Sequence, residues 1–215
     1  DDELEIHTKV LVLSMGAEPR RLGAPGELDY KGQGISYCAT CDGKFYEDRE
    51  VVVIGGGNSA VEESLFLTKF ASKITMIHQF DHFQANKTAQ EKALAHEKIS
   101  VIWNSEPRRF EKLADSRMAV HYENIKTKET SVIETDGIFV FIGMAPNTSG
   151  LGDHIKKNDW GYVLTDENMA TNIPGVYAVG DMREKNYRQV VTAVNDGCIS
   201  ALSGEKYIAL KERGG

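Results

Sequence analysis

The feature that most constrains the fold of this chain is an apolar run that ends in closely spaced glycines. Val51–Ile54 is typical of a buried strand, residues 55–60 follow with the spacing G-x-G-x-x-A, and a helical pattern continues over residues 59–70. In such a unit the glycines allow a tight turn and close approach of a pyrophosphate, and the helix N-terminus adds partial positive charge. A glycine-rich turn without a ligand is the alternative. Strand, spacing and helix together predict a dinucleotide site.

The rest of the chain alternates between strand-like and helix-like segments. This alternation predicts an α/β fold with a largely parallel sheet. A hairpin is expected from residues 118–123 and 132–133, across a turn at 124–130. The other expected strands are 8–13, 50–54, 73–78, 100–103 and 138–142, and the expected helices are 59–70, 88–98 and 189–210.

The end of the second strand of the dinucleotide unit does not identify the nucleotide. An NAD site usually places an acid there for the ribose hydroxyls, whereas an NADP site places arginine for the 2′-phosphate. Here only His78, His82 and Lys87 could carry positive charge, and none has the planar fork of arginine. Residues expected to bind the nucleotide are Gly55, Gly57, Asn58, Ser59, Ala60, His78, Gln79, Lys87 and Gly143.

Cys38 and Cys41 form a Cys-x-x-Cys pair with three interpretations. A zinc site needs two more ligands, and no second cysteine pair exists in the sequence. An inert pair near a turn is the second, and a redox-active disulfide, favoured by a thiol near a helix start, is the third. Asp42 could move the proton or simply cap the turn. Cys198 lies on the last expected helix, where we expect a small buried residue with no redox part.

Composition excludes several classes of partner. The net charge of −7 argues against nucleic acid, which requires clustered lysine and arginine. No apolar run approaches the roughly 20 residues of a membrane helix, and the acidic start at residues 1–5 is unlike a signal peptide. We therefore expect a soluble, cytoplasmic protein without a membrane or nucleic-acid partner and without a metal.

Four segments together resemble low-molecular-weight thioredoxin reductase, and the resemblance runs across the whole chain. They are Cys38-Ala39-Thr40-Cys41-Asp42-Gly43, the run 55–63, the run Gly175-Val176-Tyr177-Ala178-Val179-Gly180-Asp181, and Arg188-Gln189-Val190-Val191-Thr192-Ala193. In this family, as in its alkyl-hydroperoxide-reductase flavoprotein relatives, the cysteine pair precedes the nicotinamide-site glycines.

The resemblance implies a Rossmann-like NAD(P)-binding domain inserted in an incomplete FAD-binding domain of the same type. The expected boundaries are 1–20 for a stub of the FAD domain, 21–144 for the NAD(P)-binding domain with the cysteines, and 145–215 for the rest of the FAD domain. The family's amino-terminal FAD motif would occupy on the order of one hundred residues before Asp1. The expected FAD-binding residues are Gly180, Asp181, Arg188, Gln189 and Val190.

By the same resemblance, electrons pass from NADPH or NADH to FAD, then to the Cys38–Cys41 disulfide, and on to thioredoxin or a thioredoxin-like or peroxiredoxin-like protein. Cys41 matches the thiol that faces the flavin, Cys38 the one that attacks the partner, and Asp42 the acid-base residue. The inserted domain would turn about linkers near 22–26 and 144–148, and the protein would be a homodimer. The alternative is a truncated dinucleotide-binding fragment without turnover.

One departure from the family concerns the nucleotide. The NADPH enzymes of the family place arginines where Gln79, Phe80 and Gln84 stand in this chain. We therefore expect weakened discrimination, with NADH used at least as well as NADPH.

Overall fold

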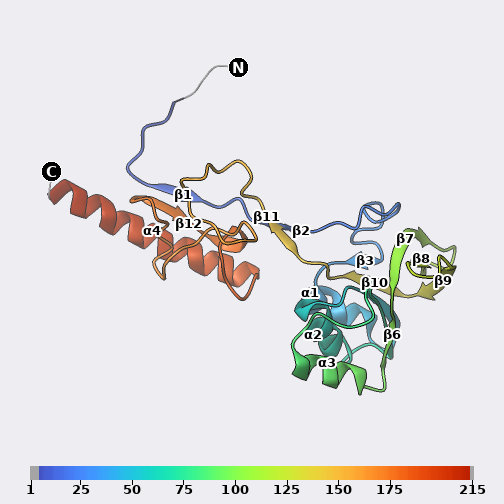
Figure 1. Ribbon diagram of the computed structural model, residues 1–215. Helices are drawn as coiled ribbons and strands as arrows, with labels where there is room; N and C mark the ends of the chain where they lie inside the picture. The colour runs from blue at the N-terminus through green and yellow to red at the C-terminus, as the bar shows by residue number, and fades with distance from the viewer. Residues whose placement is uncertain (1–4, 214–215) are drawn as a thin grey trace. The chain divides into compact units, whose positions relative to one another are not determined.

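The computed structural model describes residues 5–213 and divides the chain into two compact units. One is the continuous segment Pro19–Gly143, and the other joins the described residues before Pro19 to those from Met144 onward. Each unit is described by itself (Figure 1).

A five-stranded parallel sheet forms the centre of the Pro19–Gly143 unit. Its order is β3-β10-β4-β5-β6, so the strand before the glycine motif, β4, is the middle strand. The strands are β3 (Ile35–Ser36), β10 (Gly137–Val140), β4 (Glu50–Ile54), β5 (Lys73–Ile77) and β6 (Ile99–Ile102). The parallel α/β arrangement expected from the sequence is confirmed.

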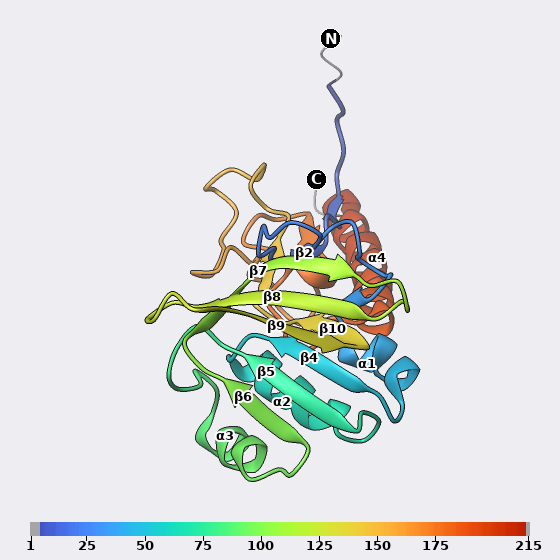
Figure 2. The same cartoon turned by 90° about the vertical axis from the view of Figure 1, so that its right-hand side faces the viewer.

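Both faces of this sheet are covered, because alternate side chains of β4 point to opposite sides. Val51 and Val53 join the core under helices α2 (Asn58–Leu67) and α3 (Lys87–Leu94), whereas Val52 and Ile54 join a second core on the other face. Figure 2 shows α2 and α3 on one side of β4, β5 and β6. A short helix, α1 (Ala39–Asp42), and a 3-10 turn, η1 (Gly43–Tyr46), connect β3 to β4.

The second core is closed by a three-stranded antiparallel sheet. It consists of β7 (Ser105–Lys112), β8 (Met118–Asn124) and β9 (Thr130–Thr135), in the order β7-β8-β9. The sequence predicted only the hairpin of β8 and β9, and the absence of β7 from that prediction was wrong. β7 carries Pro107, and its pairing with β8 shifts register between Pro107 and Arg109, so its sequence lacks a clean alternation of apolar and polar residues.

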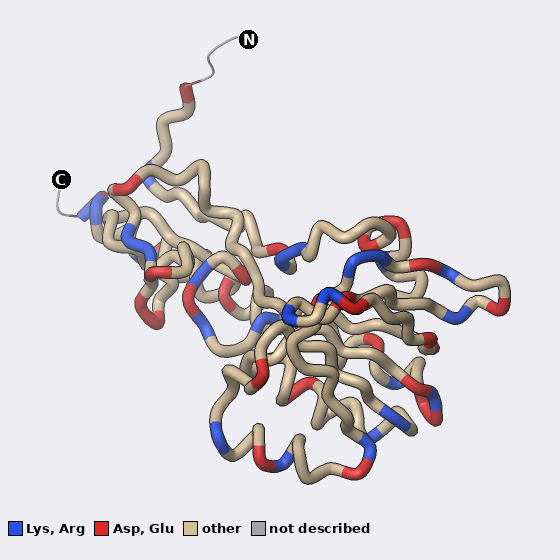
Figure 3. The backbone as a smooth tube through the Cα atoms, turned by 45° about the vertical axis from the view of Figure 1, so that its right-hand side comes forward, with Lys and Arg blue, Asp and Glu red and all other residues tan. Residues whose placement is uncertain are grey.

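Charged side chains on this sheet are arranged as pairs of opposite sign. Arg109 lies 2.6 Å from Glu111, and Arg117 lies 3.1 Å from Glu134. Figure 3 shows basic and acidic positions mixed along the described chain. Because these pairs are largely exposed, each contributes at most about 1 kcal/mol to stability.

The other unit is built around a two-stranded parallel sheet and a long helix. β1 (Leu11–Leu13) pairs with β12 (Val176–Ala178), and α4 spans Val190–Arg213. The buried residues of α4 are Asp196, Ser200 and Gly204, four residues apart. A Cβ on Gly204 would lie 3.0 Å from the Val10 side chain, so these small residues allow close packing. The unit also contains η2 (Gly180–Met182) and β11 (Met144–Pro146), which pairs with β2 (Ala17–Pro19), a strand whose last residue opens the other unit.

Cys198 on α4 is exposed, so the expectation that it is buried was wrong. The buried face of α4 is instead the one that carries Asp196 and Ser200.

Within residues 5–213, the structure contains no helix with the length and apolar character needed to cross a membrane.

Candidate functional site

The cysteine pair lies where strand β3 gives way to helix α1. Cys38 and Cys41 form a disulfide, with their Cα atoms 5.3 Å apart. Cys38 is the N-cap of α1, and its sulfur accepts a hydrogen bond from the backbone N–H of Cys41 at 3.2 Å. Cys38 is half-buried, whereas Cys41 is exposed. The disulfide is therefore held at the edge of the unit, where another molecule can reach it.

Ser36 connects the cysteine pair to Asp42. The Ser36 hydroxyl donates to Oδ2 of Asp42 at 2.6 Å and accepts from the backbone N–H of Cys38 at 3.1 Å. Ser36 is only 5% exposed, so water cannot replace these bonds. The hydroxyl fixes the carboxylate of Asp42 relative to the N-cap cysteine. Sequence analysis missed Ser36, whose only signal is a small hydroxyl residue two positions before Cys38.

A buried carboxylate, Glu27, ties the segment before β3 to the residue next to Cys38. Glu27 accepts from the backbone N–H groups of Leu22 (3.0 Å) and Gly23 (2.8 Å), and from the Tyr37 hydroxyl at 2.9 Å. Burial, together with the hydrogen bond to Glu27, raises the pKa of Tyr37 well above its usual range. Tyr37 therefore remains a hydrogen-bond donor to Glu27 through the neutral pH range.

The glycine motif forms the turn expected between β4 and α2. Gly55 has a φ of +133°, and a Cβ there would collide with the carbonyl oxygen of Phe141, so only glycine fits. A Cβ on Gly57 would meet nothing within 4 Å, which leaves space for a ligand against the backbone. Gly57 caps α2 without a side-chain hydrogen bond to the helix, and Ala60 is fully buried behind the turn. This geometry fits a pyrophosphate at the start of α2.

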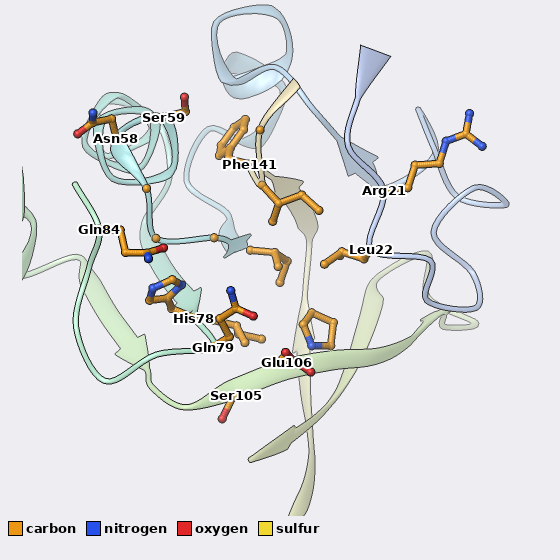
Figure 4. A pocket seen from close by; sticks show the side chains of 18 of the residues that line it. Arg21, Leu22, Asn58, Ser59, His78, Gln79, Gln84, Ser105, Glu106 and Phe141 are labelled. Carbon is orange, nitrogen blue, oxygen red and sulfur yellow. The ribbon is translucent and has the colours of Figure 1, made fainter. Parts of the chain in front are cut away.

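A cavity of about 560 Å³ opens in front of this turn (Figure 4). It contains seven of the residues expected from the sequence: Gly55, Gly57, Asn58, Ser59, His78, Gln79 and Gly143. Ala60 supports the turn from behind, and Lys87, at the first position of α3, lies outside the set of described residues that line the cavity. The polar lining residues that sequence analysis did not propose as site residues are Arg21, Gln84, Ser105, Glu106 and Arg108.

Asn58 also holds the loop that follows β5. Its side-chain oxygen accepts from the backbone N–H of Asn86 at 2.7 Å, and Asn86 Nδ2 donates to Glu62 at 2.9 Å. The backbone N–H of Gln84 bonds to the carbonyl oxygen of Gly56 at 2.8 Å. The loop is therefore fixed to the glycine turn, which keeps Gln84 at the cavity.

The imidazole of His78 lines the cavity as a neutral group rather than as a cation. It is 4% exposed, and its ring lies 5.4 Å from that of Phe80 and 6.2 Å from that of Trp103. Burial lowers the pKa of His78. Its Nε2 atom is buried without a hydrogen-bond partner among the described residues. His78 therefore does not supply the positive charge that sequence analysis considered for it.

The loop after β5 also carries an acid, Asp81, which is directed elsewhere. Asp81 bonds to His82 at 2.8 Å and to Lys126 at 3.1 Å, and it is outside the set of described residues that line the cavity. These bonds lower its pKa to about 2. The acid that the cavity does contain is Glu106 on β7.

The second group of expected site residues lies in the other unit. Gly180 begins η2 with a φ of +72°, and Arg188 stacks on the Tyr162 ring at 4.2 Å. Val190, the first residue of α4, is 82% exposed. Oδ1 of Asp181 is buried without a partner among the described residues. A ligand hydroxyl would satisfy this oxygen, so the turn fits a polar cofactor.

Asp196, which sequence analysis missed, holds that turn in place. Its carboxylate accepts from the Gly180 N–H at 3.0 Å, from Arg183 at 2.9 Å and from Lys185 at 2.8 Å. Burial opposes the charge, but the hydrogen bonds from Arg183 and Lys185 outweigh it and lower the pKa of Asp196. No sequence signal identifies this residue, because its partners lie at separated positions along the chain. Within the described chain, no group of three or more His, Cys, Asp or Glu side chains could hold a metal ion.

The chain was compared with known protein families. Residues 1–197 match the family described as pyridine nucleotide-disulphide oxidoreductase.

Relatives match the chain over most of its length. It is 47% identical to the 34.2 kDa protein in the rubredoxin operon of Clostridium pasteurianum, over 98% of this chain and 70% of that protein. It is 45% identical to thioredoxin reductase of Peptoclostridium acidaminophilum, over 96% of this chain and 67% of that protein. The crystal structure of thioredoxin reductase from Streptococcus pyogenes superposes with a TM-score of 0.86 at 40% identity, covering 93% of this chain and 65% of that one. The chain thus spans about two thirds of the length of these relatives.

Proposed function

This chain belongs to the pyridine nucleotide-disulphide oxidoreductase family, and we propose that it is the nicotinamide-nucleotide and cysteine part of a flavin-dependent disulfide reductase. One observation carries the proposal. The Pro19–Gly143 unit contains both a disulfide at a helix start and a cavity in front of a dinucleotide-type glycine turn. One folded unit would therefore carry the redox-active disulfide and bind the electron donor.

The residues proposed to hold the nucleotide are those around the glycine turn. Gly55, Gly57 and Ala60 shape the turn, the start of α2 at Asn58 and Ser59 would face the pyrophosphate, and His78, Gln79 and Gly143 line the same cavity. Because Gln79 and Gln84 stand at the cavity in place of arginines, we expect NADH to be used at least as well as NADPH.

We assign FAD to the other unit, with Gly180, Asp181, Arg188, Gln189 and Val190 as its proposed contacts. The buried Oδ1 of Asp181, which has no partner within residues 5–213, supports this assignment. When bound, the reduced nicotinamide and FAD would supply the two electrons that reduce a disulfide. The expected domain boundaries, 1–20 and 145–215 for the FAD domain and 21–144 for the NAD(P) domain, are part of the same proposal.

The cysteine chemistry follows from the arrangement at α1. Two electrons and two protons convert the Cys38–Cys41 disulfide to a dithiol. Cys38, as a thiolate, attacks a disulfide of the partner protein to give a mixed disulfide and a partner thiolate, and Cys41 then displaces the second partner sulfur and restores the Cys38–Cys41 disulfide. The N-cap position stabilises a thiolate on Cys38, and Asp42, held by Ser36, would take up and return the proton.

Thioredoxin or a related disulfide protein is the partner that we propose, since two of the relatives above are thioredoxin reductases. Such an enzyme would act as a homodimer. The second candidate function is a dinucleotide-binding module without turnover, which the glycine turn and the cavity in front of it support without reference to the cysteines.

The test is spectroscopic. We would incubate the full chain with FAD, remove unbound FAD by gel filtration and record the visible spectrum of the protein. We would then titrate it with NADH and NADPH and assay reduction of a thioredoxin disulfide. Flavin absorbance that bleaches on titration, and turnover that Cys38→Ser abolishes but Cys198→Ser leaves intact, would support the reductase. A colourless chain whose melting temperature rises with nucleotide would support the module. A chain that binds neither FAD nor nucleotide would contradict both.

A further inference from the structure

We propose that Glu106 determines nucleotide specificity, by supplying the ribose-binding acid that the end of β5 lacks and thereby favouring NADH over NADPH. This inference rests on the proposed nucleotide-binding function of the cavity. In a dinucleotide-binding fold the acid usually follows the second strand of the unit. Here the acid at that place, Asp81, is bound to His82 and Lys126 and lies outside the described lining of the cavity.

The position of Glu106 follows from how β7 begins. The backbone N–H of Ser105 bonds to the carbonyl oxygen of His78 at 2.9 Å, so the start of β7 is anchored to the residue directly before Gln79. Glu106 and Gln79 both line the cavity (Figure 4), and the Glu106 side chain is 35% exposed. A residue far away in the sequence thus reaches the place where the ribose acid of an NAD site is expected.

The charges around Glu106 oppose a phosphate rather than attract one. Gln79, Gln84 and the buried His78 are neutral lining side chains. Arg108 is a cation at the cavity, but its Nη1 lies 2.9 Å from Glu106 and its Nη2 lies 3.3 Å from Glu123. One guanidinium therefore faces two carboxylates, of which Glu123 is also paired with Lys128 at 3.3 Å. Arg21 lies on the side of the cavity away from Gln79 and Glu106 in Figure 4.

The two nucleotides differ at the ribose that this acid would face. A carboxylate accepts hydrogen bonds from the ribose hydroxyls of NADH, because it offers several acceptor lone pairs. The 2′-phosphate of NADPH carries negative charge instead, which a nearby carboxylate repels. Glu106 would thus strengthen NADH binding and weaken NADPH binding at the same time.

The experiment measures binding of NADH and NADPH to the full chain by calorimetry, so that it does not depend on turnover. The variant is Glu106→Gln, which keeps the shape and removes the charge. The control is Glu111→Gln, on the same strand, where the carboxylate pairs with Arg109 at 2.6 Å outside the cavity lining. We expect wild type to bind NADH more tightly, Glu106→Gln to reduce the NADH preference by about tenfold, and Glu111→Gln to leave it unchanged.

Glu106 could weaken NADPH binding in two ways, by repelling the 2′-phosphate directly or by occupying Arg108, which would otherwise bind that phosphate. We expect Glu106→Gln to bind NADPH more tightly than wild type, and a double variant separates the two causes. If this tighter binding persists in Glu106→Gln/Arg108→Gln, repulsion by the Glu106 carboxylate caused the preference, as proposed. If the gain disappears, Arg108 is the determinant and the inference is overturned. A preference that Glu106→Gln leaves unchanged overturns this inference alone, whereas failure of wild type to bind either nucleotide overturns the proposed nucleotide function as well.

Discussion

The hydroxyl of Ser36 satisfies two groups at once, a carboxylate oxygen of Asp42 and the backbone N–H of Cys38. Buried polar groups that lose their partner are costly, because water cannot reach them. The same two hydrogen bonds therefore stabilise the unit and position Asp42 relative to Cys38.

We predict that Ser36→Ala lowers the free energy of unfolding by about 1–3 kcal/mol, since it leaves the Asp42 oxygen and the Cys38 N–H without this partner. Urea denaturation measures the change. The control is Ser64→Ala, because the Ser64 hydroxyl is equally buried but has no hydrogen-bond partner among the described residues. Equal losses in the two variants would contradict the importance of the Ser36 hydrogen bonds.

The raised pKa of Tyr37 predicts that the stability of the protein falls at alkaline pH. Because its pKa is raised in the folded protein, its contribution to stability is complete below the unfolded value of about 10 and is lost as the pH rises above it. Tyr37→Phe should therefore be less stable than wild type at pH 7, by about 0.5–1.5 kcal/mol, and should lose less stability above pH 10. Melting curves at several pH values test this, with Tyr122→Phe as the control. Parallel alkaline losses in wild type and Tyr37→Phe would exclude Tyr37 as the cause.

At the scale of single residues, the sequence identified the side chains that belong to local motifs and missed those that depend on tertiary contacts. Cys38, Cys41 and the glycines carry a spacing that can be recognised without a structure. Glu106 carries no such spacing, and a hydroxyl residue two positions before Cys38 is too common a pattern to identify Ser36, because each residue acts through a partner that folding brings to it. Lys87 was expected at the site because it stands in the segment after β5, and it begins α3, outside the described lining of the cavity.

At the scale of elements, the longer strands with strong apolar patterns were predicted, whereas β7 and the short strands β2, β3, β11 and β12 were not. β4 and β5 are buried on both faces and are almost continuously apolar, so their sequences are unambiguous. β7 is half-exposed, contains Pro107 and carries two arginines, and only its pairing with β8 makes it a strand. β7 is also the strand that brings Glu106 to the cavity.

The turn between β4 and α2 predicts different results for its two motif glycines. Gly55→Ala should destabilise the unit, because the added Cβ meets the backbone of Phe141 in a conformation that favours glycine. Gly57→Ala should melt near wild type, since nothing lies within 4 Å of its Cβ, but should weaken nucleotide binding by about tenfold, or about 1.4 kcal/mol. Thermal melting with and without NADH measures both. Full NADH affinity in Gly57→Ala would place the pyrophosphate elsewhere.

At the scale of the whole molecule, the continuous unit contains its own cores. The two clusters that cover the faces of its sheet consist entirely of residues between Pro19 and Gly143. We predict that this segment, expressed alone, unfolds cooperatively and still binds nucleotide, because none of those core residues is lost. Circular dichroism melting and an NADH thermal shift test the prediction. A molten, nucleotide-free fragment would mean that the unit depends on the rest of the chain.

The two ends of this unit are neighbours, since the backbone N–H of Arg20, its second residue, bonds to the carbonyl oxygen of Gly143, its last, at 2.9 Å. A segment whose two ends meet can be exchanged by recombination without stretching the chain that surrounds it. Such an exchange would carry the thiol pair and the nucleotide preference together. Choice of electron donor and choice of disulfide chemistry would then be inherited as a single cassette, independently of the host scaffold.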